Sequence, residues 1–311
     1  MDNQQFSLNT LFVVSGEMIS EHGEDFYSYK YSTSNGFIGV FDGCGGIGAR
    51  KYPEFDNYTG AFLASRATAL AALDWWTNSN LSADCLKNTI VRNLSELKQQ
   101  TSNNLILKGS LSQKSFPTTA SIISFDFSMK CQCDCFWIGD SRGYILDDTG
   151  LAQITKDDID GNIDAFANIN TDSCLKNVIN ADSPFEINHR MLTLNTPALL
   201  IVATDGCFAY YETPMEFEYA ILSSLLKADS ISDWKNNMHD IFQEQASDDY
   251  TLAIAVYGYR SYQELQEKLK SRHTFIHNTY ILPLQNYREK EISLDVEHLW
   301  DEYRRSYYRY G

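Results

Sequence analysis

Acidic residues recur at the ends of apolar, strand-like runs in this chain of 311 residues. In GVFDGCGG (39–46), the carboxylate of Asp42 and the thiol of Cys44 follow an apolar run and stand among four glycines. The other acidic residues in such positions are Glu24, Asp25, Asp140, Asp205, Asp248 and Asp249. A single aspartate at a strand end is commonly a turn former, because its side chain bonds to nearby backbone N–H groups. Carboxylates gathered at one sheet edge would repel one another unless a cation neutralised them, so the whole set predicts a metal site.

The runs that carry these residues are short, rich in β-branched and aromatic residues, and closed by Gly, Asp or Asn, as expected of strands. They span 12–15, 26–32, 36–41, 119–127, 131–139, 143–148, 198–204 and 251–259. Apolar residues at helical spacing predict helices over 57–76, 83–106, 214–227 and 232–246. This order of elements favours an α+β domain, in which helices cover antiparallel sheets, over a parallel βαβ protein.

The overall charge and the apolar content exclude several classes of protein. With 41 acidic and 25 basic residues, the formal charge of −16 disfavours contact with a phosphate backbone, so nucleic acid is not an expected partner. No apolar stretch approaches the roughly 18 residues of a membrane span, and the N-terminal MDNQQFSLNTLFVVSGEM lacks the basic region of a signal peptide. Seven irregularly spaced cysteines are typical of reduced thiols. We therefore expect a cytoplasmic protein without a membrane partner.

The last fifty or so residues differ in character from the rest. After Tyr259 the pattern becomes polar and helical, and LWDEYRRSYYRYG interleaves tyrosine with arginine. We predict a domain over 1–258 and a helical, Tyr- and Arg-rich extension over 259–311. The extension either recruits a partner through these side chains or packs against the domain.

Six segments resemble, in order and at suitable intervals, the motifs of the metal-dependent protein phosphatases of the type 2C family, in the style of its bacterial members. These segments are GEDFYSY, GVFDGCGG, FPTTASIISF, WIGDSRGYIL, LLIVATDGCFAYYE and SDDYTLAIAV. The resemblance covers about residues 10 to 258 and implies a four-layer α-β-β-α sandwich of two antiparallel sheets flanked by helices. It also implies hydrolysis of phosphoserine or phosphothreonine in a protein substrate, in opposition to a serine/threonine kinase.

The resemblance also implies roles at the predicted metal site. Asp42 would bridge two ions, and the following Gly43 would offer its backbone carbonyl. Asp205 and Asp248 match further metal ligands, which makes these two residues and Asp42 the expected catalytic residues. Two divalent ions about 3.5–4 Å apart activate a water at neutral pH and stabilise the charge of an in-line phosphoryl transfer. Ligands that are all oxygen favour Mn²⁺ or Mg²⁺ over Zn²⁺.

Three further acidic residues match outer positions of the family's metal centre. Glu24 and Asp25 correspond to a pair that reaches the ions through water. Asp140 corresponds to a ligand of an additional, third ion that some members bind. Asp249 stands where the family commonly has Asn, so it is the less expected direct ligand.

The sequence departs from the family pattern around the phosphate. Cys44 stands where animal and plant members usually carry a His that is thought to protonate the leaving group, so Cys44 is not expected to be a nucleophile. The arginine that commonly precedes the Glu-Asp pair is absent from the stretch 20–23. Arg50 and Lys51, which follow the glycine turn, and His22 are the candidates to bind the phosphate in its place. Each of them has the alternative interpretation of a solvated surface residue.

These departures leave two alternatives to an active protein phosphatase. The first is a pseudophosphatase, a binding or regulatory module that keeps the fold without turnover. The second is a phosphatase that acts on small phosphorylated metabolites.

Three other sequence features are expected to be structural or to lie beside the metal site rather than in it. CQCDC (131–135) places alternate thiols along one face of a strand, so buried thiols are favoured over a chelating site. Arg142 in WIGDSRGYIL is expected to tether neighbouring backbone or carboxylate. Residues 152–190 lie where the family has a variable flap beside the active site, and 168–185 are the candidate for substrate contact.

Overall fold

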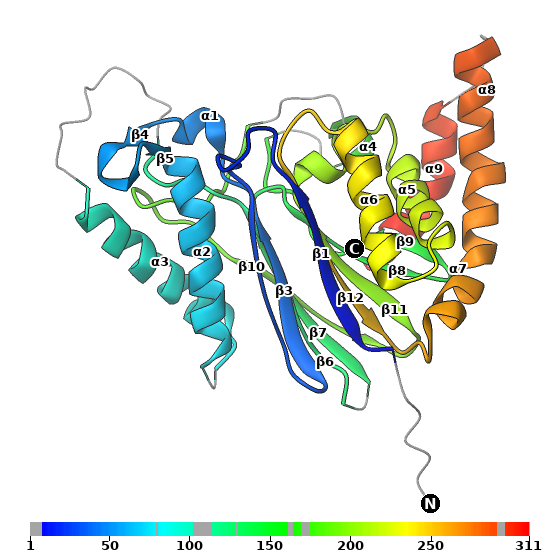
Figure 1. Cartoon of the computed structure of the whole chain (residues 1–311), viewed down its shortest axis with the longest axis horizontal. Helices are drawn as coiled ribbons and strands as arrows, with labels where there is room; N and C mark the ends of the chain where they lie inside the picture. Colours follow the sequence, from blue (N-terminus) through cyan, green and yellow to red (C-terminus); the bar gives the residue numbers. More distant parts are fainter. Residues whose placement is uncertain are drawn as a thin grey trace, which may run out of the picture.

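Two five-stranded antiparallel sheets pack face to face (Figure 1). The computed structural model describes residues 8–78, 80–101, 114–128, 130–160, 164–168, 174–290 and 296–310. The first sheet has the strand order β1 (Thr10–Gly16), β12 (Tyr250–Tyr257), β11 (Ala198–Ala203), β8 (Arg142–Asp147) and β9 (Gly150–Gln153). The second has the order β10 (Asn188–Leu194), β7 (Cys131–Ile138), β6 (Ala120–Asp126), β3 (Asn35–Phe41) and β2 (Phe26–Tyr31).

The central core lies between the two sheets and is built from side chains that alternate along their strands. Ile38 and Val40 of β3 meet Leu200 and Val202 of β11 in one apolar cluster. The three thiols of CQCDC belong to the same cluster and are free cysteines, which confirms that they are buried. Such alternation is required because one face of each strand must enter this core while the other faces a helix layer.

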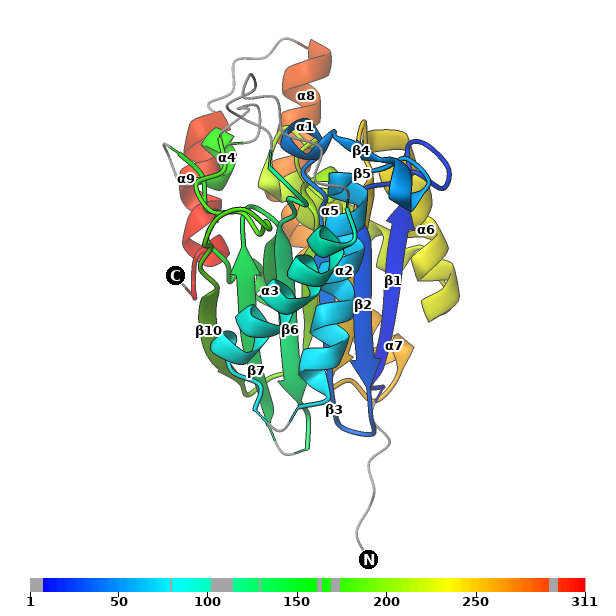
Figure 2. The ribbon, with the colours of Figure 1, turned by 90° about the vertical axis from the view of Figure 1, so that its left-hand side faces the viewer.

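Helices form the two outer layers (Figures 1 and 2). The second sheet is covered by α2 (Gly60–Trp76) and α3 (Ala83–Gln99), and the first by α5 (Pro214–Leu226), α6 (Ile231–Gln245) and α7 (Tyr262–Ile276). Side chains cap these helices at their starts; Thr59 accepts from the N–H of Phe62, and Thr213 with Glu216 forms a capping box before Pro214. The predicted α-β-β-α sandwich is confirmed.

The structure departs from the predicted elements at several places, and the helix predicted over 57–76 begins only at Gly60. The helix predicted over 83–106 ends at Gln99, where the polar run 100–104 (QTSNN) begins; residues 102–106 lie outside the described residues. The strands β9 and β10 were not predicted. The first has four residues, and the second is an edge strand with mostly polar or half-exposed side chains.

The C-terminal residues pack against the first sheet and its helices. They comprise α7, a π-helical turn (His277–Ile281), α8 (Leu282–Lys290) and α9 (Val296–Tyr307). Trp300, Tyr303 and Tyr307 of α9 are at most 3% exposed and share an apolar cluster with β8, β11 and β12. Among the described residues, no helix combines the length and the apolar character that crossing a bilayer requires.

Candidate metal centre

The acidic residues at the strand ends converge on one pocket of about 620 Å³. Asp42 follows β3, Asp205 follows β11, and Asp248 precedes β12. The acidic side chains that line the pocket are Glu24, Asp25, Asp42, Asp140, Asp205, Asp248 and Asp249. They meet because the last residues of β3 and β7 and the first residues of β2 lie at the same end of the second sheet. The end of β11 and the start of β12 lie together at the corresponding end of the first sheet.

The backbone at Asp42 and Gly43 is held by close contacts with three segments. The carbonyl of Asp42 accepts hydrogen bonds from the N–H of Thr119 (2.8 Å) and the hydroxyl of Thr118 (2.7 Å). A Cβ at position 43 would lie 2.6 Å from the carbonyl oxygen of Ala61 and 2.7 Å from that of Glu24, so glycine is required here by backbone packing. This contact fixes the direction of the chain where it leaves β3.

The carboxylates in the pocket raise one another's pKa values. Burial, followed by the charge of Asp248, raises the pKa of Asp205 to about 6. Burial, followed by the charge of Asp205, raises the pKa of Asp140 to about 7. The pKa of Asp42 lies well above its usual value, first through burial and then through the charges of Asp205 and Asp25. The ionised pocket therefore carries negative charge that the protein compensates poorly.

This donor set fits hard divalent cations. The side chains that converge are carboxylates, and one buried oxygen, Oδ1 of Asp140, has no hydrogen-bond partner among the described residues. Lys114 is the one basic side chain that lines the pocket in the described part of the chain. Oxygen ligands with surplus negative charge suit Mg²⁺ or Mn²⁺. Among the described residues, no three or more His, Cys, Asp or Glu side chains are already arranged so that they could hold a metal ion. Which of them bind the metal is therefore a proposal.

Two of the acidic residues also hold the backbone around the pocket. Asp249 accepts the N–H of Met18 at one carboxylate oxygen (2.7 Å) and that of Glu24 at the other (2.6 Å). Asp25 accepts the hydroxyl of Thr204 (2.7 Å), and this hydroxyl accepts the N–H of Thr251 (2.9 Å). Sequence reasoning did not identify Thr204, although it directly precedes Asp205 in the ATDGC segment. The bonds to Asp249 agree with its expected role outside the direct ligands.

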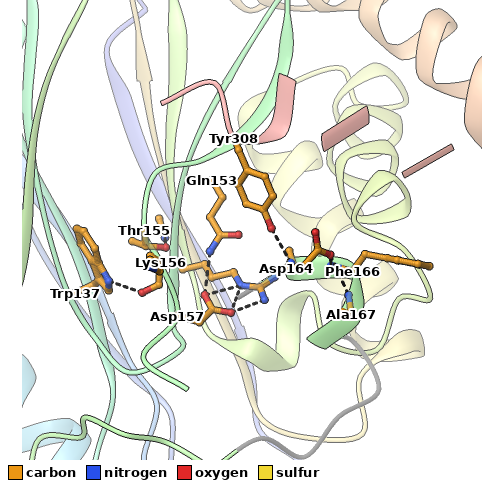
Figure 3. A network of polar contacts seen from close by, with 12 residues as sticks. Trp137, Gln153, Thr155, Lys156, Asp157, Asp164, Phe166, Ala167 and Tyr308 are labelled. Carbon is orange, nitrogen blue, oxygen red and sulfur yellow. Dashed lines mark hydrogen bonds and ion pairs between the residues drawn. The ribbon is translucent and has the colours of Figure 1, made fainter. Parts of the chain in front are cut away.

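A buried ion pair lies behind the pocket. Arg142, at the start of β8, donates to Asp157 through two nitrogens, with a shortest distance of 2.6 Å, and both side chains are 5% exposed. Gln153 donates to the same carboxylate at 2.9 Å, as Figure 3 shows. The guanidinium also lies 4.2 Å from the ring centroid of Phe208. The positive charge of Arg142 offsets part of the rise in the pKa of Asp140, so it favours the ionised form of that carboxylate. The expected tethering role of Arg142 is confirmed.

Replacing Arg142 by Gln is expected to lower the free energy of unfolding by about 3–5 kcal/mol, because Asp157 would stay buried without its partner. Urea denaturation measures the loss. The matched control is Arg92→Gln, which removes an ion pair to Asp74 whose side chains are 56% and 57% exposed and which we expect to cost less than about 1 kcal/mol. Equal losses in the two variants would contradict the role of the buried pair.

Two of the three candidate phosphate-binding residues share a pocket, and the third lies apart from it. His22 and Lys51 line a second pocket of about 400 Å³ that adjoins the acidic pocket. Arg50 lines neither of the two pockets, and its guanidinium lies 4.9 Å from the ring centroid of Tyr52. Lys114, which sequence reasoning missed, lies in the acidic pocket instead. No motif marks it, because it precedes the FPTTASIISF segment in a polar stretch.

The thiol of Cys44 is held in its neutral form. It lines the acidic pocket beside Asp42, and burial followed by the charge of Asp42 raises the pKa of the thiol well above its usual value. A neutral thiol is a poor nucleophile. The environment therefore agrees with the prediction that Cys44 does not attack the substrate.

The segment predicted as a flap reaches the acidic pocket. Cys174, Leu175 and Val178 line it, while residues 169–173 of the candidate substrate-contact stretch lie outside the described residues. Earlier in the same segment, α4 (Ala165–Asn168) is hydrogen-bonded to the residue that follows α9. The N–H of Ala165 donates to the hydroxyl of Tyr308 at 2.6 Å, as Figure 3 shows. The C-terminal extension therefore contacts the segment that leads to the pocket wall.

Comparison with known proteins identifies the fold. No family model matches the chain. A curated protein of Mycoplasma genitalium, named "Putative protein phosphatase", is 23% identical over 251 residues, which are 76% of this chain and 90% of the relative. The solved serine/threonine phosphatase of Staphylococcus aureus is similar with a TM-score of 0.59 and 18% identity, over 81% of this chain and 96% of that one.

Two further similar structures carry the name PstP. The serine/threonine phosphatase of Mycobacterium tuberculosis is similar with a TM-score of 0.57 and 17% identity, over 81% of this chain and 99% of that one. The catalytic domain of the serine/threonine phosphatase PstP, solved in complex with two manganese ions, has a TM-score of 0.53 and 16% identity, over 80% of this chain and 99% of that one. The resemblance drawn from the six motifs is thus confirmed in the fold.

Proposed function

We propose that this chain is a metal-dependent protein phosphatase that hydrolyses phosphoserine or phosphothreonine in proteins. The observation that carries the proposal is the convergence of seven acidic residues from separate strand ends on one pocket of the described structure. The fold shared with serine/threonine phosphatases and the curated protein-phosphatase relative support it.

Six of the seven acidic residues would take part in metal binding, while Asp249 holds the backbone of Met18 and Glu24. Asp42, the carbonyl of Gly43, Asp205 and Asp248 would hold two divalent ions, Mn²⁺ or Mg²⁺. Glu24 and Asp25 would reach these ions through water, and Asp140 would serve a third ion. When bound, the ions lower the pKa of water and neutralise phosphate charge. The manganese complex of PstP supports the choice of metal for a chain of this fold.

The remaining chemistry falls to the protein's own residues. Lys114 in the acidic pocket and Lys51 beside it are cationic groups that could orient a phosphate, and His22, which lines the same pocket as Lys51, could assist through its ring nitrogens. The neutral thiol of Cys44 forms no covalent intermediate in this scheme. Because a thiol with a raised pKa is also a weak proton donor, alkyl leaving groups should be expelled less readily than aryl ones.

The direct test is hydrolysis of p-nitrophenyl phosphate and of a phosphoseryl peptide by the purified full chain with Mn²⁺. We expect turnover of both substrates and loss of nearly all of it in Asp42→Ala. A wild type as inert as this variant would favour the pseudophosphatase. Hydrolysis of small phosphorylated metabolites in strong preference to phosphopeptides would favour the metabolite phosphatase.

Substitution of Cys44 tests whether its thiol is a nucleophile or only occupies the position of a missing general acid. Cys44→Ser should leave turnover of p-nitrophenyl phosphate within about two- to three-fold of wild type, because the thiol is not the nucleophile. Cys44→His should speed up the phosphoseryl peptide selectively, by about ten-fold or more, because an imidazole can protonate the poorer leaving group. Steady-state kinetics on both substrates measure these effects. Abolished turnover in Cys44→Ser would restore the nucleophile interpretation.

A serine/threonine kinase is the enzyme class that would supply such a substrate. We propose that phosphorylation and its removal by this chain both take place in the cytoplasm. All seven cysteines are free thiols, which supports a reducing compartment.

A further inference from the structure

We infer that a groove beside the acidic pocket binds an apolar side chain that flanks the phosphorylated residue of an extended substrate peptide. This inference rests on the proposed function and names a determinant of its specificity. The groove is the second pocket of about 400 Å³. Its walls are formed by Met18, Ile19, His22, Lys51, Asn57, Tyr58 and Phe62.

The groove is continuous with the acidic pocket. Glu24, Asp248 and Asp249 line both of them. An extended peptide advances about 3.3 Å per residue, so a side chain one or two positions from a phosphoserine in the acidic pocket would reach the groove. The volume suits one or two side chains rather than a folded domain.

One wall exposes two apolar side chains on a loop that is held in place. Met18 is 48% exposed and Ile19 is 65% exposed. Asp249 holds the N–H of Met18, and the N–H of His22 donates to the carbonyl of Ile19 at 2.9 Å. Within the same loop, Glu21 adopts a left-handed conformation (φ 65°). The loop thus keeps apolar surface in water at the rim of the candidate metal centre, where burial against a ligand would be favourable.

The lining also contains a pair of stacked aromatic rings. The rings of Tyr58 and Phe62 are stacked with centroids 3.9 Å apart and an angle of 6° between their planes. The imidazole of His22 meets Tyr58 edge-on at 5.5 Å, and the guanidinium of Arg66 lies 3.3 Å from the ring centroid of Phe62. Such a preformed apolar face receives an aliphatic or aromatic side chain with little loss of entropy.

The charges around the groove disfavour an acidic occupant. Its boundary with the acidic pocket carries the carboxylates of Glu24, Asp248 and Asp249, which would repel an aspartate or glutamate of the peptide. The amine of Lys51 lies in the wall and opposes the attraction of these carboxylates for a basic side chain. Apolar contact is therefore the selective interaction that the groove offers.

The test compares two phosphoserine peptides that differ only at the two residues on each side of the phosphoserine, which are all Leu in one peptide and all Asn in the other. With Mn²⁺ and the full chain, we expect kcat/KM to favour the Leu peptide by about ten-fold or more. The preference should fall to about three-fold or less in Ile19→Ser and in Met18→Ser. Because each variant is scored by the ratio of its own two rates, a general loss of activity cancels.

The matched control is Leu70→Ser, since Leu70 is 58% exposed on α2 and lies outside both pocket linings. Equal kcat/KM for the two peptides in the wild type, or a preference that survives in both groove variants, would overturn the inference. If the chain turns over neither these peptides nor p-nitrophenyl phosphate, the proposed function fails by itself. Fluorescence anisotropy with labelled forms of the same two peptides then decides the inference, because tighter binding of the Leu peptide must still depend on Ile19 and Met18.

Discussion

Asp205→Asn is expected to abolish Mn²⁺-dependent turnover and at the same time to stabilise the metal-free protein. In the proposed centre Asp205 is a direct ligand, so its loss should lower kcat/KM for p-nitrophenyl phosphate by at least about 100-fold. Without metal, Asp205 is repelled by Asp248, and the neutral amide removes this repulsion. We expect a gain of about 1–2 kcal/mol in the free energy of unfolding in EDTA.

The same variant should change how stability depends on pH. Burial raises the pKa of Asp205 to about 6 and that of Asp140 to about 7, so the folded state holds protons that the unfolded state has released. The metal-free wild type should therefore lose stability as the pH rises from about 4 to about 7. In Asp205→Asn this loss should be smaller, because one of the carboxyls with a raised pKa is gone.

Thermal unfolding in EDTA and in Mn²⁺ at pH 5.5 and 8 measures both effects. Mn²⁺ should raise the melting temperature of the wild type and have little effect on Asp205→Asn. The control is Asp229→Asn, which removes an exposed carboxylate outside both pocket linings and should behave as the wild type does. Equal stabilisation of wild type and Asp205→Asn by Mn²⁺ would show that Asp205 is not a ligand.

Truncation after Gly258 is expected to prevent stable folding of the remaining chain. It removes Trp300, Tyr303 and Tyr307, each at most 3% exposed, and each such side chain contributes about 1.5–3 kcal/mol through burial. It also leaves Glu218 without the partners that neutralise it in the interior. Glu218 is fully buried and accepts from Arg272 and from the hydroxyl of Tyr303, both at 2.6 Å. The total loss approaches the whole stability of an ordinary domain, about 5–15 kcal/mol.

Yield of soluble truncated protein and its circular dichroism melt test this expectation. Two point variants refine it. Tyr303→Phe should cost about 1–3 kcal/mol because Glu218 loses a buried donor, and the matched change Tyr287→Phe, at a residue 42% exposed, should cost less than about 0.5 kcal/mol. A truncated chain that melts cooperatively near the full-length temperature would instead show that 1–258 folds as an independent domain.

Much of the fold follows from local pattern. The segments GFIGVF and ALLIVAT are continuous apolar runs, and the structure buries β3 and β11 on both faces, between the other sheet and a helix layer. Such runs have few alternatives to a central strand. The edge strand β10 was not predictable in the same way, because its exposed positions, such as Met191, leave no regular apolar face to recognise.

The candidate site was predictable to the level of residue type. Aspartates directly after buried strands indicate where oxygen ligands can gather, and Asp42, Asp140 and Asp205 all line the pocket. Lys114 was not predictable, because a lysine in a polar stretch is usually solvated. Arg50 and Lys51, adjacent in the chain, have different surroundings, since Arg50 contacts Tyr52 while Lys51 lines the groove.

The sequence by itself determined which strands form, which acidic residues stand at their ends, and which family these segments resemble, because these properties depend on residue chemistry and on periodicity over a few positions. Only the tertiary structure decided which carboxylates share a pocket and which bind backbone. The bonds from Met18 and Glu24 to Asp249 join residues 231 and 225 positions apart. Contacts at such separations arise from the packing of two sheets, so no local pattern in the chain contains them.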